Sequence, residues 1–178
     1  SIHDLQSLRS TVSQLKKSHD IVVVSFHGGA EGPKYSHVPH GPETAFGEPR
    51  GDVEKFAHAA VDAGADIVYG HGPHVPRAAE LYKDRLILYS LGNFCFGGNT
   101  NPDDKDCLIF QQTFTVTGND VATDDNINVI PCSISSVSNS NNYQPTPATG
   151  DEKTRIEAKI KKSSDSIATL SNKVSQSS

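Results

Sequence analysis

The pattern that most constrains the fold is a strand, a helix and a second strand in direct succession. Ile21–Phe26 is a continuous run of mostly β-branched residues, typical of a strand buried on both faces. Apolar residues at helical spacing predict a helix from near Asp52 to Gly64, and Ala65–Tyr69 follows as another strand. Because such a crossover is almost always right-handed and joins parallel strands, the carboxyl ends of both strands are expected at one sheet edge.

The other elements are expected to extend this unit into an α/β fold. Leucine and valine at steps of three and four predict a first helix over Ile2–Ser18. Further along the chain we expect a hairpin of Ala79–Tyr82 and Leu86–Ser90, a sheet that continues antiparallel with strands near Cys107–Thr117 and Val121–Ile134, an irregular connector over Ser135–Gly150, and a terminal helix from Asp151.

Composition limits the classes of protein and partner. A chain of 178 residues is long enough for one domain with a core, and the net charge of -5 gives no electrostatic attraction to nucleic acid, which we do not expect as a partner. The sequence has neither an apolar run of membrane-spanning length nor a signal peptide, and it contains no Met, so we expect a fragment of a longer parent. With three cysteines at least one lacks an intramolecular partner; a Cys95–Cys107 bridge and simple burial are the alternatives.

Histidines follow both predicted parallel strands. His27 comes at the end of the first strand, with Glu31 four residues later, and His71 and His74 come at the end of the second. The ends of parallel strands are where open α/β sheets place their ligands, and neutral imidazole is a preferred ligand of zinc, manganese and iron. The sequence therefore predicts a divalent metal site at this edge, although glycine-rich turns and exposed histidines also account for each segment taken alone.

Two further segments are candidates for contact with a ligand. Asn93 follows the second hairpin strand, where its amide either binds a ligand or stabilises the turn. The region from His27 to Arg50 has neither helical nor strand periodicity, and its His37, His40 and acidic residues make it a candidate lid or a source of extra ligands. The motifs of serine hydrolases, P-loop NTPases and dinucleotide-binding proteins are absent.

Three ordered blocks resemble the CapA/PgsA family of poly-γ-glutamate capsule biosynthesis proteins. They are Val22–Glu31, Asp62–Val75 and Leu88–Phe94. The resemblance implies half of a calcineurin-like metallophosphatase αββα sandwich, with a two-metal phosphoesterase centre at the strand ends. On this view residues 1–134 are the C-terminal part of that domain, 135–150 a connector, and 151–178 a helix and tail.

The family motif carries over unevenly. His27, Gly29 and Glu31 match its His-x-Gly-x-Glu block, and Pro73 and His74 match its Pro-His block. The family often has His directly before that Pro, where this chain has Gly72, with His71 one place earlier. The resemblance implies that His27, His71 and His74 bind metal, that Glu31 is a ligand, an orienting group or a proton acceptor, and that Asn93 positions substrate.

The family's N-terminal half, with the remaining metal ligands, is expected to lie outside this chain. The missing half is therefore the first expected partner, and the chain alone is expected to be inactive. Capsule polymer and membrane synthase subunits are further expected partners, and the location is expected to be the extracytoplasmic cell surface, reached through an upstream segment. A non-catalytic accessory that binds an anionic polymer or the synthase is the alternative, mildly favoured by Gly72.

Overall fold

A mixed four-stranded sheet forms the centre of the molecule. The computed structural model describes residues 1–164, except for the side chains of residues 124–126. The strand order is β1 (Val23–His27), β4 (Ile67–His71), β6 (Arg85–Leu88) and β5 (Ala79–Tyr82). β1 and β6 both run parallel to β4, and β5 is antiparallel to β6. This confirms the predicted strand–helix–strand unit and the hairpin that follows it.

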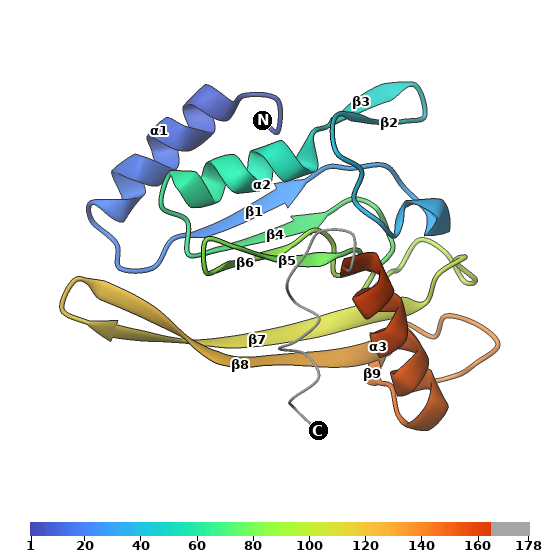
Figure 1. Ribbon diagram of the computed structural model, residues 1–178. Coiled ribbons are helices and arrows are strands. Elements are labelled where there is room, and N and C mark those ends of the chain that lie inside the picture. Colours follow the sequence, from blue (N-terminus) through green and yellow to red (C-terminus); the bar gives the residue numbers. More distant parts are fainter. Residues whose placement is uncertain (165–178) are drawn as a thin grey trace.

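Two helices cover one face of this sheet (Figure 1). α1 (Leu5–Lys16) begins at Asp4, whose carboxylate accepts from the backbone N–H of Ser7, and α2 (Val53–Asp62) is capped in the same way by Asp52. α2 ends just before Gly64, whose φ of 112° is one that glycine commonly adopts after a helix. The main core lies between the helices and the sheet and includes Val12, Phe26, Phe56, Val68 and Ile87.

A second sheet lies on the opposite side of the first (Figure 1). It contains β7 (Asp106–Thr117), β8 (Asp120–Ser133) and the two-residue β9 (Thr146–Pro147), all antiparallel. Phe110, Phe114 and Ile127 pack on Ile67, Leu86 and Leu88 of the four-stranded sheet. The antiparallel strands are therefore a separate layer and do not continue the first sheet as predicted, because the irregular segment after Tyr89 carries the chain across to the other face.

Two predicted irregular regions contain regular structure. The segment after β1 holds a short 3-10 helix (Pro33–Tyr35) and a hairpin of β2 (Glu43–Ala45) and β3 (Glu48–Gly51). Val38 from this segment is buried in the main core, whereas Phe46 is exposed, and the lid role of the segment stays a prediction. The predicted connector over 135–150 contains β9.

The C-terminal helix α3 (Gly150–Ser164) packs against the β7–β9 sheet through Ile156 and Ile160. The predicted helix from Asp151 is confirmed up to Ser164, and the rest of the 151–178 prediction lies outside the described residues. Together these elements establish a mixed α/β fold, whereas its assignment to half of a metallophosphatase sandwich stays a prediction.

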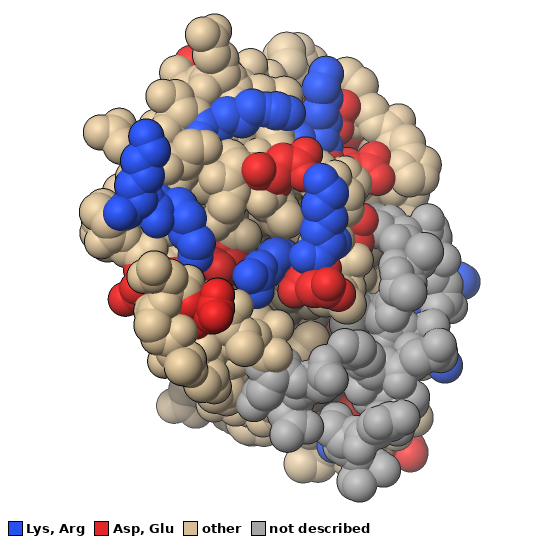
Figure 2. Space-filling view, turned by 60° about the vertical axis from the view of Figure 1, so that its left-hand side comes forward, with Lys and Arg blue, Asp and Glu red and all other residues tan. Residues whose placement is uncertain are grey.

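Charged side chains of opposite sign are interspersed on the face shown in Figure 2. Among the ion pairs of the described residues, Lys83 Nζ lies 2.6 Å from Asp62, and Lys16 Nζ lies 2.7 Å from the buried Asp66. Over the residues that the structure describes, no helix combines the length and the apolar character needed to cross a membrane.

Candidate functional site

His27 and His71 lie side by side at the carboxyl ends of β1 and β4. They are register partners, and the N–H of Gly28 donates to the carbonyl of His71 over 2.8 Å. Partial burial and the neighbouring His27 both lower the pKa of His71. At neutral pH His71 is therefore an uncharged imidazole, the form that binds metals. The predicted meeting of the two strand ends is confirmed for this pair.

Gly72 explains why the two histidines can approach each other. It has a φ of 120°, and a Cβ at this position would lie 3.1 Å from Nε2 of His27 and 3.0 Å from the carbonyl oxygen of Gly28. A side chain here would meet both a strained backbone and the His27 ring. In this chain Gly72 thus leaves room for the His27 ring.

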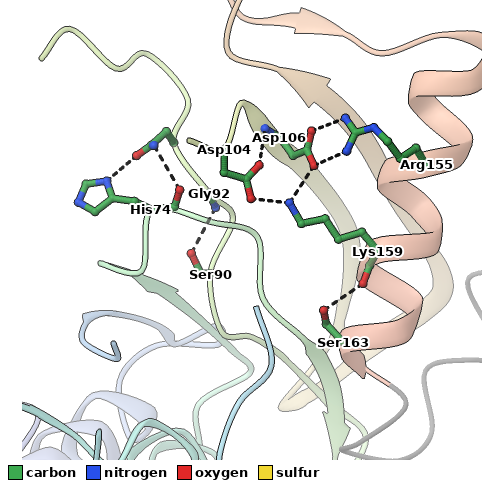
Figure 3. Close-up of polar contacts among 9 residues, drawn as sticks. His74, Ser90, Gly92, Asp104, Asp106, Arg155, Lys159 and Ser163 are labelled. Atoms are coloured by element: carbon green, nitrogen blue, oxygen red, sulfur yellow. Dashed lines mark hydrogen bonds and ion pairs between the residues drawn. The ribbon is translucent and has the colours of Figure 1, made fainter. Parts of the chain in front are cut away.

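His74 is held by Asn93 and not by the other two histidines. Nδ1 of His74 lies 2.6 Å from Oδ1 of Asn93, while Nδ2 of Asn93 donates to the His74 carbonyl over 3.3 Å (Figure 3). Because that carbonyl can only accept, the Asn93 amide must present its oxygen to the ring, and neutral His74 therefore carries its proton on Nδ1. The Nε2 lone pair remains available, as in histidines oriented to bind a metal.

The backbone of His74 is also unusual. Its φ of 59° lies in the left-handed region, which is uncommon for residues other than glycine and is concentrated at functional sites. The Asn93 side chain is buried and occupied on both sides by His74. Both ends of the Asn93 amide therefore contact His74, and the predicted contact of Asn93 with a ligand stays a prediction.

Glu31 points to Arg50 and not to the histidines. Its Oε1 lies 3.0 Å from Nη2 of Arg50, and both side chains are mostly buried. Glu31 nevertheless lines the same cavity as His74 and Asn93, a space of about 530 Å³ with an aromatic rim of Tyr35, Phe46 and Phe96. The structure thus places Glu31, His74 and Asn93 around one cavity, whereas His71 lines a different groove.

The predicted metal ligands do not form a complete site on their own. Among the residues that the structure describes, no three or more His, Cys, Asp or Glu side chains are gathered as metal ligands would be. His27 and His71 form one pair, and His74 is committed through Nδ1 to Asn93. This donor set is too small for a two-metal centre, so metal ligation by these residues stays a prediction.

A buried ion pair beneath the site was not found from the sequence. The guanidinium of Arg77 is fully buried and binds both carboxylate oxygens of Glu43, at 3.1 and 2.8 Å. Arg77 also donates to the carbonyl of His37, and Glu43 accepts from the N–H of Ala30. Nothing local in the sequence marks this pair, since its members are 34 positions apart.

The remaining histidines have other partners. His40, a candidate extra ligand, binds Glu54 of α2 at 2.8 Å, and Glu54 raises the pKa of His40. His58 binds Glu80 at 2.9 Å and stacks on Tyr82 with ring centroids 3.9 Å apart. His58 is therefore packed against β5.

Comparison with known proteins connects this site to a family. The family model described as bacterial capsule synthesis protein PGA_cap matches residues 2–98, which include all five candidate site residues. The chain belongs to the PGA_cap family. The matched PGA_cap region ends before β7, so the second sheet and α3 lie outside it.

Individual relatives agree with this assignment. The chain is 41% identical over 92 residues to the capsule biosynthesis protein CapA of Bacillus anthracis, covering 52% of this chain and 19% of that protein. It is 42% identical over 85 residues to the PGA biosynthesis protein CapA of Bacillus subtilis, covering 48% of this chain and 19% of the relative. A probable polyglutamine synthesis accessory protein of Mycobacterium tuberculosis is 40% identical over 78 residues, 44% of this chain and 17% of that protein. The matched part of the chain thus spans about a fifth of the length of these curated relatives.

Proposed function

We propose that this chain is part of a protein of poly-γ-glutamate capsule biosynthesis or export, and that its histidines contribute to a metal-dependent phosphoesterase centre. The observation that carries the proposal is the pairing of His27 and His71 at the ends of parallel strands in a PGA_cap chain. His74, with Nε2 free and its orientation fixed by Asn93, is the third contributor. Other polypeptide supplies the missing ligands.

In this proposal the chain's own residues prepare the site for a divalent ion such as zinc, manganese or iron. The lowered pKa of His71 keeps a lone pair available at neutral pH, and Asn93 fixes which nitrogen of His74 faces outward. Glu31, beside the same cavity as His74, is positioned by Arg50 and accepts a proton or orients a ligand.

The missing half of the domain is the first proposed partner. Between the four-stranded sheet and β7, a largely apolar groove of about 510 Å³ is lined by residues that include Val23, Tyr69, His71 and Phe110. Among the described strands β1 pairs only with β4, so its other edge has unpaired backbone groups. Strands from the rest of the parent would cover this groove and this edge.

Metal titration tests the proposed histidine ligands directly. The chelator-treated chain is titrated with zinc or manganese in a calorimeter, and His27→Ala and His71→Ala should each weaken binding at least about tenfold, or 1.4 kcal/mol. His3→Ala, a change at an exposed histidine on the N-terminal segment, is the matched control and should bind as the unaltered chain does. Unchanged affinity in the His27→Ala/His71→Ala double variant would refute the proposal.

The alternative is a non-catalytic accessory that binds the capsule polymer or the synthase. It is favoured by the incomplete donor set of the described residues. Assays of the intact parent with a generic phosphodiester separate the two: hydrolysis lost in His27→Ala supports the enzyme. Polymer binding without hydrolysis supports the accessory.

We further propose an extracytoplasmic, membrane-associated location for the parent, consistent with capsule synthesis at the cell surface. Protease added to intact cells should cleave the parent if this is correct. Protection of the parent in intact cells, with cleavage only after lysis, would contradict it.

A further inference from the structure

Two buried cysteines face each other across the second sheet. Cys107 of β7 and Cys132 of β8 are register partners in the antiparallel ladder, and directly opposed residues project from the same face. Both are almost completely buried and belong to one apolar cluster with Ile134. The third cysteine, Cys95, is exposed.

The backbone spacing of this pair suits a disulfide. Lys105 and Ile134 lie opposite each other two positions along the same ladder, and the N–H of Ile134 donates to the carbonyl of Lys105. Because hydrogen-bonded and non-hydrogen-bonded pairs alternate along an antiparallel ladder, Cys107 and Cys132 are also a hydrogen-bonded pair. Such pairs have Cα atoms about 5.5 Å apart, within the range of disulfides. Closing the bond requires the two Cβ atoms to approach by about an ångström.

We propose that Cys107 and Cys132 form an intramolecular cross-strand disulfide, a covalent modification site separate from the histidine edge. The bond closes a loop of roughly 25 residues that contains most of the β7–β8 hairpin. Cys107 directly follows Asp106, the carboxylate that binds Arg155 of α3 at 2.6 Å. The disulfide thus fastens the hairpin at the point where α3 docks.

The chemistry requires a disulfide oxidant and an open hairpin. One thiolate attacks oxidised glutathione and releases one reduced glutathione, and the second thiolate then displaces another from the mixed disulfide. Each of the two released glutathione molecules takes up one of the two thiol protons. In the folded chain burial raises the pKa of Cys107 to about 12 and also raises that of Cys132, so the thiols are protonated and react slowly. The bond is therefore expected to form during folding.

The test follows the bond by mass spectrometry. The full chain is unfolded and reduced, refolded in a mixture of reduced and oxidised glutathione, alkylated under denaturing conditions and digested. The expected result is one alkylated residue, Cys95, and a Cys107–Cys132 linked peptide at least about tenfold more abundant than the two other pairings. Oxidation should also raise the melting temperature.

Two variants keep the outcome interpretable. Cys95→Ser removes the exposed thiol and should leave the linked peptide and the rise in melting temperature unchanged. Cys132→Ser should abolish both. Three alkylated cysteines after refolding, or bridges that mainly involve Cys95, would overturn the proposal, whatever the metal-binding measurements show.

Discussion

Arg77 and Glu43 form a two-pronged, fully buried ion pair that joins the segment after β1 to the segment after β4. Arg77 approaches Gly29 so closely that a Cβ on Gly29 would lie 2.4 Å from Nη1 of Arg77. Through Glu43 the pair also holds the N–H of Ala30. The Arg77–Glu43 ion pair therefore holds the loop that follows His27 in place.

Breaking this pair should destabilise the chain strongly. Arg77→Met leaves a buried carboxylate and Glu43→Gln leaves a buried guanidinium without its counter-charge, so each should lower the free energy of unfolding by about 3–5 kcal/mol. The double variant Arg77→Met/Glu43→Leu should be more stable than Arg77→Met. Urea denaturation measures both effects, and single variants within about 0.5 kcal/mol of the unaltered chain would contradict the prediction.

Removing the Asn93 side chain should release the His74 ring. In Asn93→Ala the Nδ1 proton loses its acceptor, and we expect the His74 imidazole to populate both tautomers, visible in its 15N chemical shifts. Loss of such an orienting partner typically weakens metal binding about 10–100-fold. Ser90→Ala, a small buried change on the same segment, is the control. A single Nδ1-protonated tautomer in Asn93→Ala would show that Asn93 does not hold the ring.

His71 should titrate below its ordinary pKa of 6.5. Because the unfolded chain then binds the proton more tightly, stability should fall as pH drops from about 6.5 through the lower folded pKa, and the loss is complete below it. His27→Gln removes one of the two causes, so the pKa of His71 should rise but remain below 6.5, since burial persists. NMR titration with chelator present measures this, and a pKa of His71 at or above 6.5 in the unaltered chain would refute it.

The docking of α3 should depend on Asp106. Burial raises the pKa of this carboxyl, but hydrogen bonds from Arg155 and Lys159 outweigh burial and hold the pKa below its usual value (Figure 3). Its contribution to stability is therefore present above about pH 3.8 and is lost as pH falls through the lower folded pKa.

Asp106→Asn should lower the free energy of unfolding by about 1.5–3 kcal/mol, the range for a hydrogen bond to a charged group. It should also speed amide exchange in α3 more than in α2. The control is Lys153→Ala, which removes an exposed pair with Glu157 and should change stability by less than about 0.5 kcal/mol. Equal exchange changes in α2 and α3 would argue against a local docking role.

The uncovered side of β1 should cause self-association. Val23 is 53% exposed and lines the apolar groove, so Val23→Lys should reduce the apparent mass measured by light scattering. Val116→Lys, at a residue 42% exposed near the tip of the β7–β8 hairpin, is the matched control and should leave association unchanged. A monodisperse monomer before any substitution would contradict the prediction.

Sequence reasoning predicted the elements whose signals are local. The β-branched run before His27 and the apolar spacing of α2 predicted the strand–helix–strand crossover. Because the two strands are parallel, their carboxyl ends meet, and His27 lies beside His71. It did not find the pairing of β6 with β4 or the Arg77–Glu43 contact, because these depend on packing between distant segments. His74 does not join His27 and His71, for a local reason: positive φ values at Gly72 and His74 turn the chain, so that the His74 ring meets Asn93.

The space that Gly72 leaves for His27 also constrains how this site can evolve. A mutation that gives residue 72 a side chain meets a φ of 120° and the His27 ring together. Such a change requires the loop or the His27 ring to shift, so the two positions are sterically coupled. A side chain introduced at position 72 should therefore disturb the His27 ring as well as the loop that carries it.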